Sequence, residues 1–342
     1  MLKFVYIFNP FTGTNLLLCL NQTFCKAPKV PLFKGLHLFV VLFLLVLTLT
    51  ASMAAHLDLP AQYGEVIYQT NEKSPNQLYI IGTGHRDSLT CLNSNLTPRV
   101  QAEVYKIGEW LIDQRGIELL LPEGFFKNGT KKVSKEKTQA VRGKKRPPEG
   151  VDIKVLEERL STNKTYVNAE MLLIRDHSLR VQQIEDKGHY DAVGNGIFKL
   201  VNSGKDLCDY SLQKSELDYL QERRIAAILQ KIPERIDEEL RQGNIPDRKA
   251  LFTIGMSHLP RIIKYLNEKR ITIPSPLLTS NKNDDYPAEL NLFKENFGVS
   301  ILIPRTLAND KEILKLNGLD KIVEQSRSKS PVLSSFASPR LP

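Results

Sequence analysis

One short pattern occurs twice, far apart in the chain, and it constrains the fold more than any other feature. Residues 78–85 read Leu-Tyr-Ile-Ile-Gly-Thr-Gly-His, and residues 251–258 read Leu-Phe-Thr-Ile-Gly-Met-Ser-His. In each, an apolar run typical of a buried strand ends at Gly-x-x-His, where a turn is expected. A proline, helical periodicity and another apolar run follow each pattern, the last at 117–121 and at 271–273. The sequence therefore predicts two strand–helix–strand units.

These units carry histidines and an acid at positions that a sheet would bring together. Strand–helix–strand units usually make parallel strands, and such sheets bind ligands beyond the carboxyl ends of the strands. We therefore expect His85 and His258 at one edge of the sheet. Glu123 follows the run 117–121 after a single proline, so its carboxylate is expected at the same edge. An ordinary loop acid is the alternative interpretation of Glu123.

A split site made of His85, Glu123 and His258 indicates a divalent metal ion. Two neutral imidazoles and a carboxylate can hold Mn, Co or Zn and leave positions open for water. Such an ion polarises a carbonyl and lowers the pKa of water towards neutrality. Glu123 would either ligate the ion or stand just outside it and take the proton of the water. The pattern therefore favours metal-dependent hydrolysis.

Other chemistries fit the sequence less well. Residues 255–259 place Ser257 after a strand but lack the second glycine of a serine-hydrolase elbow. Residues 82–84 complete no Walker or dinucleotide fingerprint, and no His-Glu-x-x-His occurs. Cys91 lacks a recognisable surrounding pattern for cysteine catalysis.

A helix is expected over 164–182, and Arg175 is its most informative residue. The apolar face would consist of Val167, Met171, Leu172, Ile174 and Leu179. Arg175 falls inside this arc. A buried guanidinium needs a partner, so Arg175 would face a carboxylate or an anionic substrate. The alternative is that its long side chain extends from the edge of the stripe into solvent.

Two other charged groups receive no catalytic role. Glu185 and His189 have the four-residue spacing of helical metal ligands, but Gly188 argues against a continuous helix there. A long helix is expected over 214–242, broken or kinked at Pro233. Its charged residues Asp218, Glu222, Arg223 and Arg224 are interpreted as a solvated face.

The net charge of +9 is not spread over the expected domain. Residues 1–34 contain four lysines and no acid, and residues 127–150 contain nine basic and two acidic residues. The rest of the chain is therefore nearly neutral. This distribution removes the compositional support for a nucleic-acid partner.

Residues 1–55 have the composition of a leader. A positively flanked apolar run at 36–49 precedes small residues, as in an export signal. An uncleaved anchor is the alternative, because the segment approaches the roughly 20 residues that span a bilayer. We therefore expect an exported protein, periplasmic or extracellular, or one held at the membrane through residues 36–55. In an oxidising compartment Cys91 and Cys208 could pair, or both could remain buried thiols.

The rest of the chain is expected to form one α/β domain over 60–322. Its first strand, at 64–69, would turn back as a hairpin into the strand that ends at Gly82. A basic flexible insertion would occupy 127–150, and a disordered tail 323–342.

The motif residues resemble those of the TraB/PrgY and TIKI families. These families belong to a superfamily that includes the erythromycin esterases and the haem-associated ChaN proteins. The residues that carry the resemblance are Gly82-Thr83-Gly84-His85, Glu123, Arg175-Asp176 and Ile254–Pro260. The resemblance implies a central mixed, partly parallel β-sheet with helices on both faces and an internal pseudo-duplication. It also implies that His85, Glu123 and His258 form the metal or catalytic centre, which Arg175 helps to arrange.

The families that the chain resembles suggest what such a centre does. TIKI proteins are metal-dependent peptidases that clip secreted signalling proteins, PrgY-type proteins restrain a peptide pheromone, and erythromycin esterases hydrolyse an ester. The resemblance therefore implies a divalent-metal-dependent hydrolase, peptidase-like, acting on a peptide or a small ester. The alternative is a non-catalytic protein of the same fold that sequesters a peptide or haem, with His189 or His258 as the axial ligand.

Overall fold

A computed structural model describes residues 5–8, 15–18, 57–84, 96–126, 152–161, 168–202, 207–273 and 289–329. The chain divides into two compact units, Met1–Ala54 and Ala55–Pro342. In the first, β1 (Val5–Phe8) pairs antiparallel with β2 (Asn15–Leu18). Four predictions concern residues outside the described ranges: the apolar segment 36–55, His85, the pairing of Cys91 with Cys208, and the insertion 127–150.

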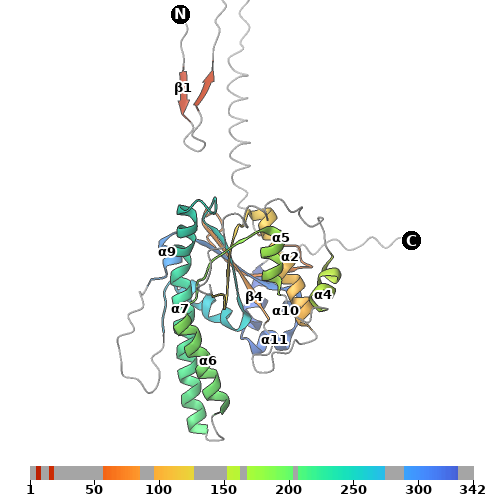
Figure 1. Ribbon diagram of the computed structural model, residues 1–342, viewed down its shortest axis with the longest axis vertical. Helices are drawn as coiled ribbons and strands as arrows, with labels where there is room; N and C mark the ends of the chain where they lie inside the picture. Colours follow the sequence, from red (N-terminus) through yellow and green to blue (C-terminus); the bar gives the residue numbers. More distant parts are fainter. Residues whose placement is uncertain are drawn as a thin grey trace, which may run out of the picture. The chain divides into compact units, whose positions relative to one another are not determined.

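The second unit is built on a six-stranded sheet in the order β3-β8-β4-β7-β5-β6 (Figure 1). The strands are β3 (Gly64–Thr70), β4 (Gln77–Thr83), β5 (Leu119–Pro122), β6 (Arg180–Val181), β7 (Lys249–Gly255) and β8 (Gly298–Pro304). Only β3 runs antiparallel to its neighbour β8, while the other described pairs are parallel. The predicted α/β class with a mixed, partly parallel sheet is therefore confirmed.

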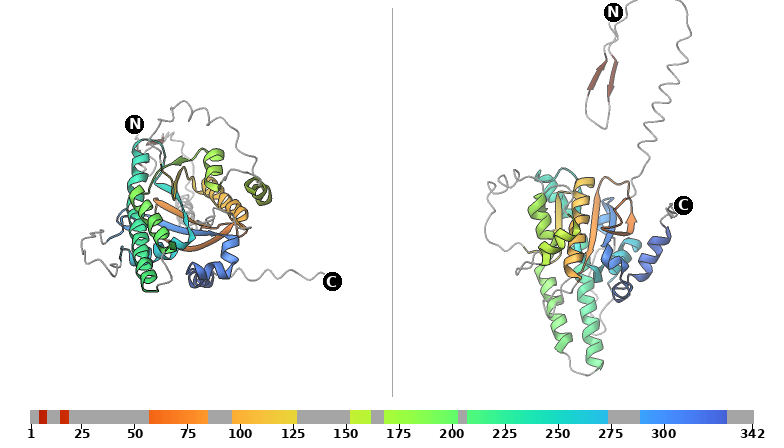
Figure 2. Two further views of the ribbon diagram at one scale, coloured as in Figure 1. Left: turned by 60° about the horizontal axis from the view of Figure 1, so that its bottom comes forward. Right: turned by 90° about the vertical axis from the view of Figure 1, so that its right-hand side faces the viewer.

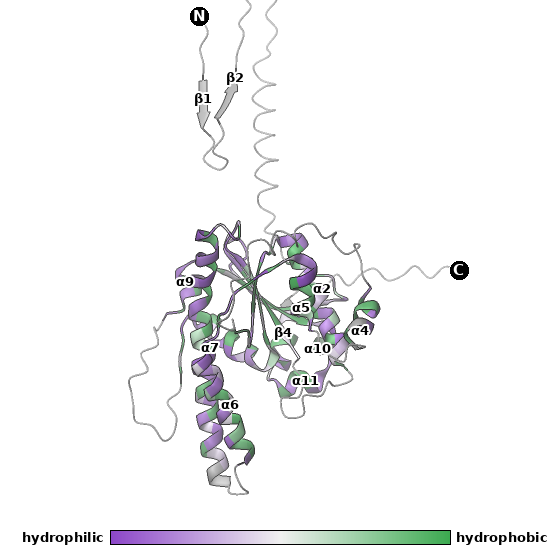
Figure 3. Ribbon diagram, in the orientation of Figure 1, coloured by the Kyte–Doolittle hydropathy of each residue, from purple (hydrophilic) through white to green (hydrophobic). Residues whose placement is uncertain are grey.

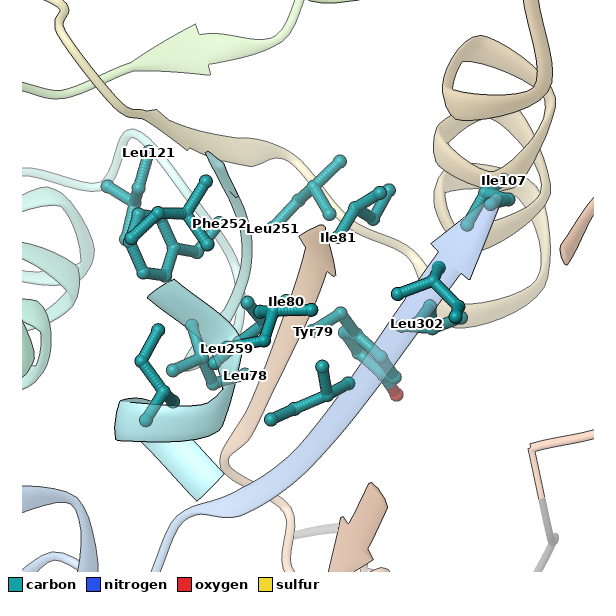
Figure 4. Close-up of a cluster of buried hydrophobic side chains, with 14 of the residues drawn as sticks. Leu78, Tyr79, Ile80, Ile81, Ile107, Leu121, Leu251, Phe252, Leu259 and Leu302 are labelled. Carbon is teal, nitrogen blue, oxygen red and sulfur yellow. The ribbon is translucent and has the colours of Figure 1, made fainter. Parts of the chain in front are cut away.

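The two Gly-x-x-His motifs end adjacent strands. β4 pairs with β7 in parallel, from Gln77 opposite Lys249 to Thr83 opposite Gly255. Both strands are almost fully buried, because a parallel sheet covered on both faces favours continuous apolar runs. Figure 4 shows side chains of these strands in one hydrophobic cluster with residues of β5, β8 and the covering helices. The expectation that both motifs end at one sheet edge is therefore confirmed for the strands.

Helices cover the sheet on both faces (Figures 1 and 2). On one side, α2 (Thr97–Arg115) contacts β4, β8, α4 (Ile153–Ser161), α5 (Ala169–His177) and α10 (Arg305–Asn309). On the other, α7 (Leu207–Arg241) contacts α6 (Lys187–Asn202), α8 (Leu259–Glu268) and α9 (Asn291–Lys294). Figure 3 shows hydrophilic and hydrophobic residues on each of the larger helices, as expected for amphipathic helices.

Within the described residues, no helix combines the length and the apolar composition that crossing a membrane requires.

Two predicted connections are wrong, and both involve β8. The first two strands of the domain do not form a hairpin, because β8 lies between β3 and β4 and pairs with both. The run 271–273 is not a strand; the strand that follows α8 in the sheet is β8. The second strand–helix–strand unit therefore consists of β7, α8 and β8. The internal duplication stays a prediction.

Three smaller predictions concern helices. The chain from residue 323 is not disordered up to Lys329, because α12 (Asp320–Lys329) buries Val323 and Arg327 binds Glu65. Glu185 and His189 share no continuous helix, as predicted, because α6 begins at Lys187 and so contains Gly188 and His189 but not Glu185. Pro233 does not break α7, which continues through it, and a kink there stays a prediction. The remaining described helix, α11 (Lys311–Leu316), follows α10.

The glycine of the first motif allows close contact with the helix after the second motif. A Cβ atom at Gly82 would lie 2.5 Å from Leu259 Cδ1 and 3.3 Å from Ile303 Cγ2. Leu259 is fully buried and directly follows His258, so it has little room to move. Gly82 therefore helps to fix where α8 begins, and with it the position of His258.

We predict that Gly82→Ala lowers the free energy of unfolding by about 1–3 kcal/mol, because it overpacks the contact with Leu259. Chemical denaturation measures the change. Gly194→Ala is the control, since nothing lies within 4 Å of the Cβ it would add to α6. That variant should be neutral or more stable by up to about 1 kcal/mol. Equal behaviour of the two variants would contradict this role of Gly82.

Candidate functional site

Glu123 lies at the carboxyl edge of the sheet, directly after β5. Its main-chain N–H donates to Thr253 O at 2.9 Å, which attaches the start of the loop to β7. Its Oε2 accepts a hydrogen bond from the N–H of Gly255 at 2.6 Å, and its Oε1 accepts one from Arg224 Nη2 at 2.7 Å. The side chain is only 9% exposed. Glu123 is therefore held in one orientation by β7 and α7.

His258 lies beside this carboxylate. It ends the 3₁₀ turn η1 (Met256–His258) and precedes α8, whose first turn contains a proline. Its Nε2 lies 3.3 Å from Oε1 of Glu123, which is within ion-pairing distance. Its Nδ1 is buried and has no hydrogen-bond partner among the described residues. The structure thus brings together two of the predicted site residues and leaves one imidazole nitrogen unused.

Arg224 of α7 connects Glu123 to a second buried acid, Glu185. The guanidinium donates to Glu185 through Nη2 and, at 3.4 Å, through Nε. Glu185 also accepts from the N–H of Gly124 at 3.2 Å. Tyr190 covers the guanidinium, whose Cζ lies 5.0 Å from the ring centroid. Arg224 and Glu185 are 6% and 2% exposed, so the pair is almost free of solvent.

Two carboxylates share one guanidinium in this cluster. Burial tends to lower the pKa of Arg224, but the nearby charges of Glu123 and Glu185 raise it by more, so the guanidinium stays protonated. Burial, and to a smaller extent the charge of Glu123, raise the pKa of Glu185 in spite of its bonds to Arg224. Glu185 therefore holds a proton more readily than an exposed glutamate does.

The arginine of this site is not the one that the sequence pattern favoured. The charged residues around Arg224 in the sequence predict a solvated face, yet Arg224 is buried. The signal for it was present: Arg224 lies seven residues after Leu217 and four before Ile228, both of which are buried. That spacing places Arg224 within an apolar stripe, just as the spacing around Arg175 predicts for that residue.

Arg175 lies elsewhere: the prediction that it is buried in the apolar stripe is wrong, and the alternative, a side chain that extends into solvent, is confirmed. The buried face of α5 consists of Ala169, Leu172 and Leu173, whereas Met171 is 52% exposed. The Arg175 side chain is 56% exposed and binds the neighbouring Asp176 at 2.7 Å. Because α5 leads into the start of β6, which runs parallel to β5, its last turn lies towards the amino edge of the sheet. Arg175 is therefore remote from Glu123 and His258.

The remaining ligand-type residues bear on the predicted metal. His85 lies outside the described residues. The described ranges alone contain no group of three or more His, Cys, Asp or Glu residues arranged to hold a metal ion. The unused buried Nδ1 of His258 fits one ligand of such an ion, whereas both oxygens of Glu123 already have partners.

A cavity of about 310 Å³ lies at the same sheet edge. Thr83 and Gly84 line it at the end of β4, and Met256 and Ser257 line it after β7. Met256 and Ser257 lie between Gly255, which binds Glu123, and His258. The cavity and the charged cluster therefore share the turn η1.

We predict that Arg224→Met lowers the free energy of unfolding by about 3–5 kcal/mol, because it leaves two buried carboxylates without their cation. The matched control on the same helix is Lys214→Met, whose exposed pair with Asp218 is worth about 1 kcal/mol or less. Urea denaturation compares the two variants. Similar small losses in both would show that Arg224 is not a buried partner of these acids.

We also predict a pH effect from Glu185. Its pKa is raised in the folded state, so its contribution to stability is full below the unfolded pKa and is lost as the pH rises through the folded value. Glu185→Gln removes this titration. The stability of wild type relative to Glu185→Gln should therefore fall over the pH range above 4.5, the ordinary pKa of a glutamate carboxyl. Denaturation of both proteins over this range measures it; a constant or rising difference would contradict the prediction.

Comparison with known proteins finds no match for this chain. No protein-family model, no curated protein and no solved structure matches the chain. The resemblance to the TraB/PrgY and TIKI families therefore stays a prediction from the motif residues. The contact of Glu123 with His258, and the pair of Glu185 with Arg224, are the observations from which a function has to be argued.

Proposed function

We propose that this protein is a divalent-metal-dependent hydrolase, peptidase-like in its substrate, that is exported or anchored to the membrane. The single observation that carries the proposal is the contact between Glu123 and His258 at the carboxyl edge of a parallel sheet. Ligands of such sheets bind at this edge. The two Gly-x-x-His motifs end adjacent strands there, because Thr83, two residues before His85 in the sequence, lies opposite Gly255, three residues before His258.

The geometry of His258 resembles that of a metal-binding histidine. Such histidines usually donate their second ring N–H to a carboxylate, which fixes the tautomer and the ring orientation. With its proton on Nε2, His258 faces Oε1 of Glu123 and has a lone pair on the buried Nδ1. A buried nitrogen without a partner is costly unless a ligand satisfies it. Nδ1 of His258 is thus the atom that we propose as a ligand, together with His85.

In this proposal Glu123 is a positioning residue. Its oxygens accept from Gly255 and Arg224, so it orients the imidazole and contributes negative charge without contacting the ion. Arg224 in turn holds Glu123 and is itself held by Glu185. The carboxylate of Glu123 beside His258 would attract a dication bound to that histidine. When bound, the ion would polarise a carbonyl and lower the pKa of water.

The alternatives differ in what the edge of the sheet would bind. Haem needs an exposed axial ligand beside an apolar pocket, whereas His258 is buried against Glu123. The arrangement therefore favours a small ion over haem. The choice of a peptide over a small ester rests on the resemblance to the TIKI and PrgY proteins, and the export or anchoring on the apolar segment 36–55.

We predict that the purified protein binds about one Mn, Co or Zn ion per chain, as expected for a site of this ligand type. His85→Ala and His258→Ala should each lose both the metal and the hydrolysis of a peptide library. Glu123→Gln should bind the metal about 10–100-fold more weakly, because it orients a ligand rather than acting as one. Elemental analysis of each variant gives the metal content.

The control is His177→Gln, which changes a buried histidine of α5 outside the cluster and should retain the metal. Retention of metal and of hydrolysis in both alanine variants would refute the proposed centre. Metal binding without hydrolysis of any peptide or ester would refute the enzymatic role and favour a binding protein.

A further inference from the structure

A second cavity, of about 240 Å³, lies at the amino edge of the sheet, on the side away from the charged cluster. Gln77 and Lys249, which form the first pair of β4 and β7, both line it, and Arg115 lines it from the end of α2. We call this space the amino-edge cavity. Its volume lies below the range of about 300–1,000 Å³ that is usual for drug-sized ligands, so it suits a smaller molecule.

The hydroxyl of Tyr79 is the first polar group of this cavity that a ligand can use. Tyr79 lines the cavity, is only 4% exposed, and packs its ring in the hydrophobic cluster of Figure 4. Its hydroxyl forms no hydrogen bond with any residue that the structure describes. A polar group in such a position is costly unless water or a ligand satisfies it. The Tyr79 hydroxyl is therefore a donor open to a ligand.

Arg115 brings a positive charge to the same space. Burial raises the pKa of the Tyr79 hydroxyl, and the charge of Arg115 lowers it in part, so the two groups lie close enough to interact. Within the described part of the chain, Arg115 has no ion pair, and its buried Nε has no hydrogen-bond partner. Its Cζ lies 5.8 Å from the ring centroid of Trp110. The hydroxyl and the guanidinium thus form a pair of donors, one of them charged.

The other charged residues of the described lining decide which anion fits. Lys249 is paired with Asp247 at 3.0 Å, so its charge is largely matched already. Glu72 also lines the cavity and is exposed, so it opposes any further negative charge. A monoanion therefore suits this lining better than a phosphate group, which carries up to about two negative charges. A carboxylate also has the planar shape that matches the fork of a guanidinium.

The loop that carries Glu72 is held in place by the protein itself. Asn71 Nδ2 donates to Asn296 Oδ1 at 2.8 Å, and Gln77 Nε2 donates to the main-chain oxygen of Glu72 at 3.2 Å. The absence of a side chain at Gly298 allows the loop to pack closely, because a Cβ atom there would lie 2.4 Å from Asn71 O. This wall of the cavity is therefore preformed, which lowers the entropic cost of binding.

We infer that the amino-edge cavity binds a small monocarboxylate, whose oxygens accept hydrogen bonds from the Tyr79 hydroxyl and the Arg115 guanidinium. This site is separate from the proposed metal centre, because the two lie at opposite ends of the parallel strands β4 and β7. The inference goes beyond the proposed function and does not depend on it. Glu72 at the exposed side of the cavity reduces the affinity for an anion without abolishing it, since water screens an exposed charge.

Ligand-observed NMR titration of the full chain with propionate tests the inference, with propionamide as the matched probe. The two molecules have nearly the same shape, but the amide is uncharged. Propionate should bind saturably, and propionamide about tenfold or more weakly, because hydrogen bonds between a guanidinium and a carboxylate are stronger than those to a neutral acceptor. Inorganic phosphate is the third probe, and it should displace propionate only at a higher concentration than propionate itself requires.

Four variants locate the binding. Arg115→Gln should weaken propionate by about tenfold or more, and Tyr79→Phe by about two- to tenfold, since it removes a single hydrogen bond. Glu72→Gln should strengthen propionate by up to about fivefold, because it removes a repelling charge at an exposed position. Lys264→Gln removes an exposed cation of α8 that does not line the cavity, and it should leave the affinity unchanged. If thermal denaturation shows that Arg115→Gln is unfolded, the opposite effects of Tyr79→Phe and Glu72→Gln decide.

His258→Ala separates this site from the proposed metal centre, which would also attract a carboxylate. Propionate binding that His258→Ala retains would support the cavity, whereas its loss would place propionate at the metal centre and overturn the inference. The absence of saturable binding to wild type, equal affinities for propionate and propionamide, or tighter binding of phosphate would also overturn it. So would an unchanged affinity in both Arg115→Gln and Tyr79→Phe. The metal content of His258→Ala tests the proposed function independently.

Discussion

The arrangement of the site depends on one buried cation, Arg224, between two acids. Its guanidinium joins Glu123 at the end of β5 to Glu185 before α6. Surface ion pairs contribute about 1 kcal/mol or less, whereas loss of one partner from a buried pair costs about 3–5 kcal/mol. The three groups therefore constrain the fold more than the many exposed pairs. They also hold Glu123 where it meets both the Gly255 N–H and His258.

The sheet supplies the second constraint, since it places two distant motifs side by side. β4 and β7 are parallel neighbours, and the absence of a side chain at Gly82 allows Leu259 to pack against the first motif. This contact fixes the start of α8 and hence the turn that carries Met256, Ser257 and His258. The charged cluster and the cavity share that turn.

Local sequence patterns predicted where the strands lie in the chain, but they did not predict which strands pair in the sheet. Apolar runs before Gly82 and Gly255 indicated buried strands, and the acid after β5 was expected at the edge where it lies. The position of β8 between β3 and β4 could not be predicted from local patterns, because β8 pairs with a strand more than 200 residues away in the sequence. The prediction of the buried arginine was wrong for a related reason. The spacing of apolar residues places both Arg175 and Arg224 within an apolar stripe, and only the packing of the helices shows which of the two is buried.

The sequence by itself determined the α/β class, the two motif strands, and the candidates His258 and Glu123, because hydrophobic periodicity and turn residues act over a few positions. Only the tertiary structure decided that Arg224 and Glu185, rather than Arg175, complete the cluster. It also decided that β8 separates the first two strands of the domain and that a cavity is lined by Met256 and Ser257 of the turn that ends at His258. These features arise from contacts between segments far apart in the chain, where burial and charge are set by neighbours that no local pattern specifies.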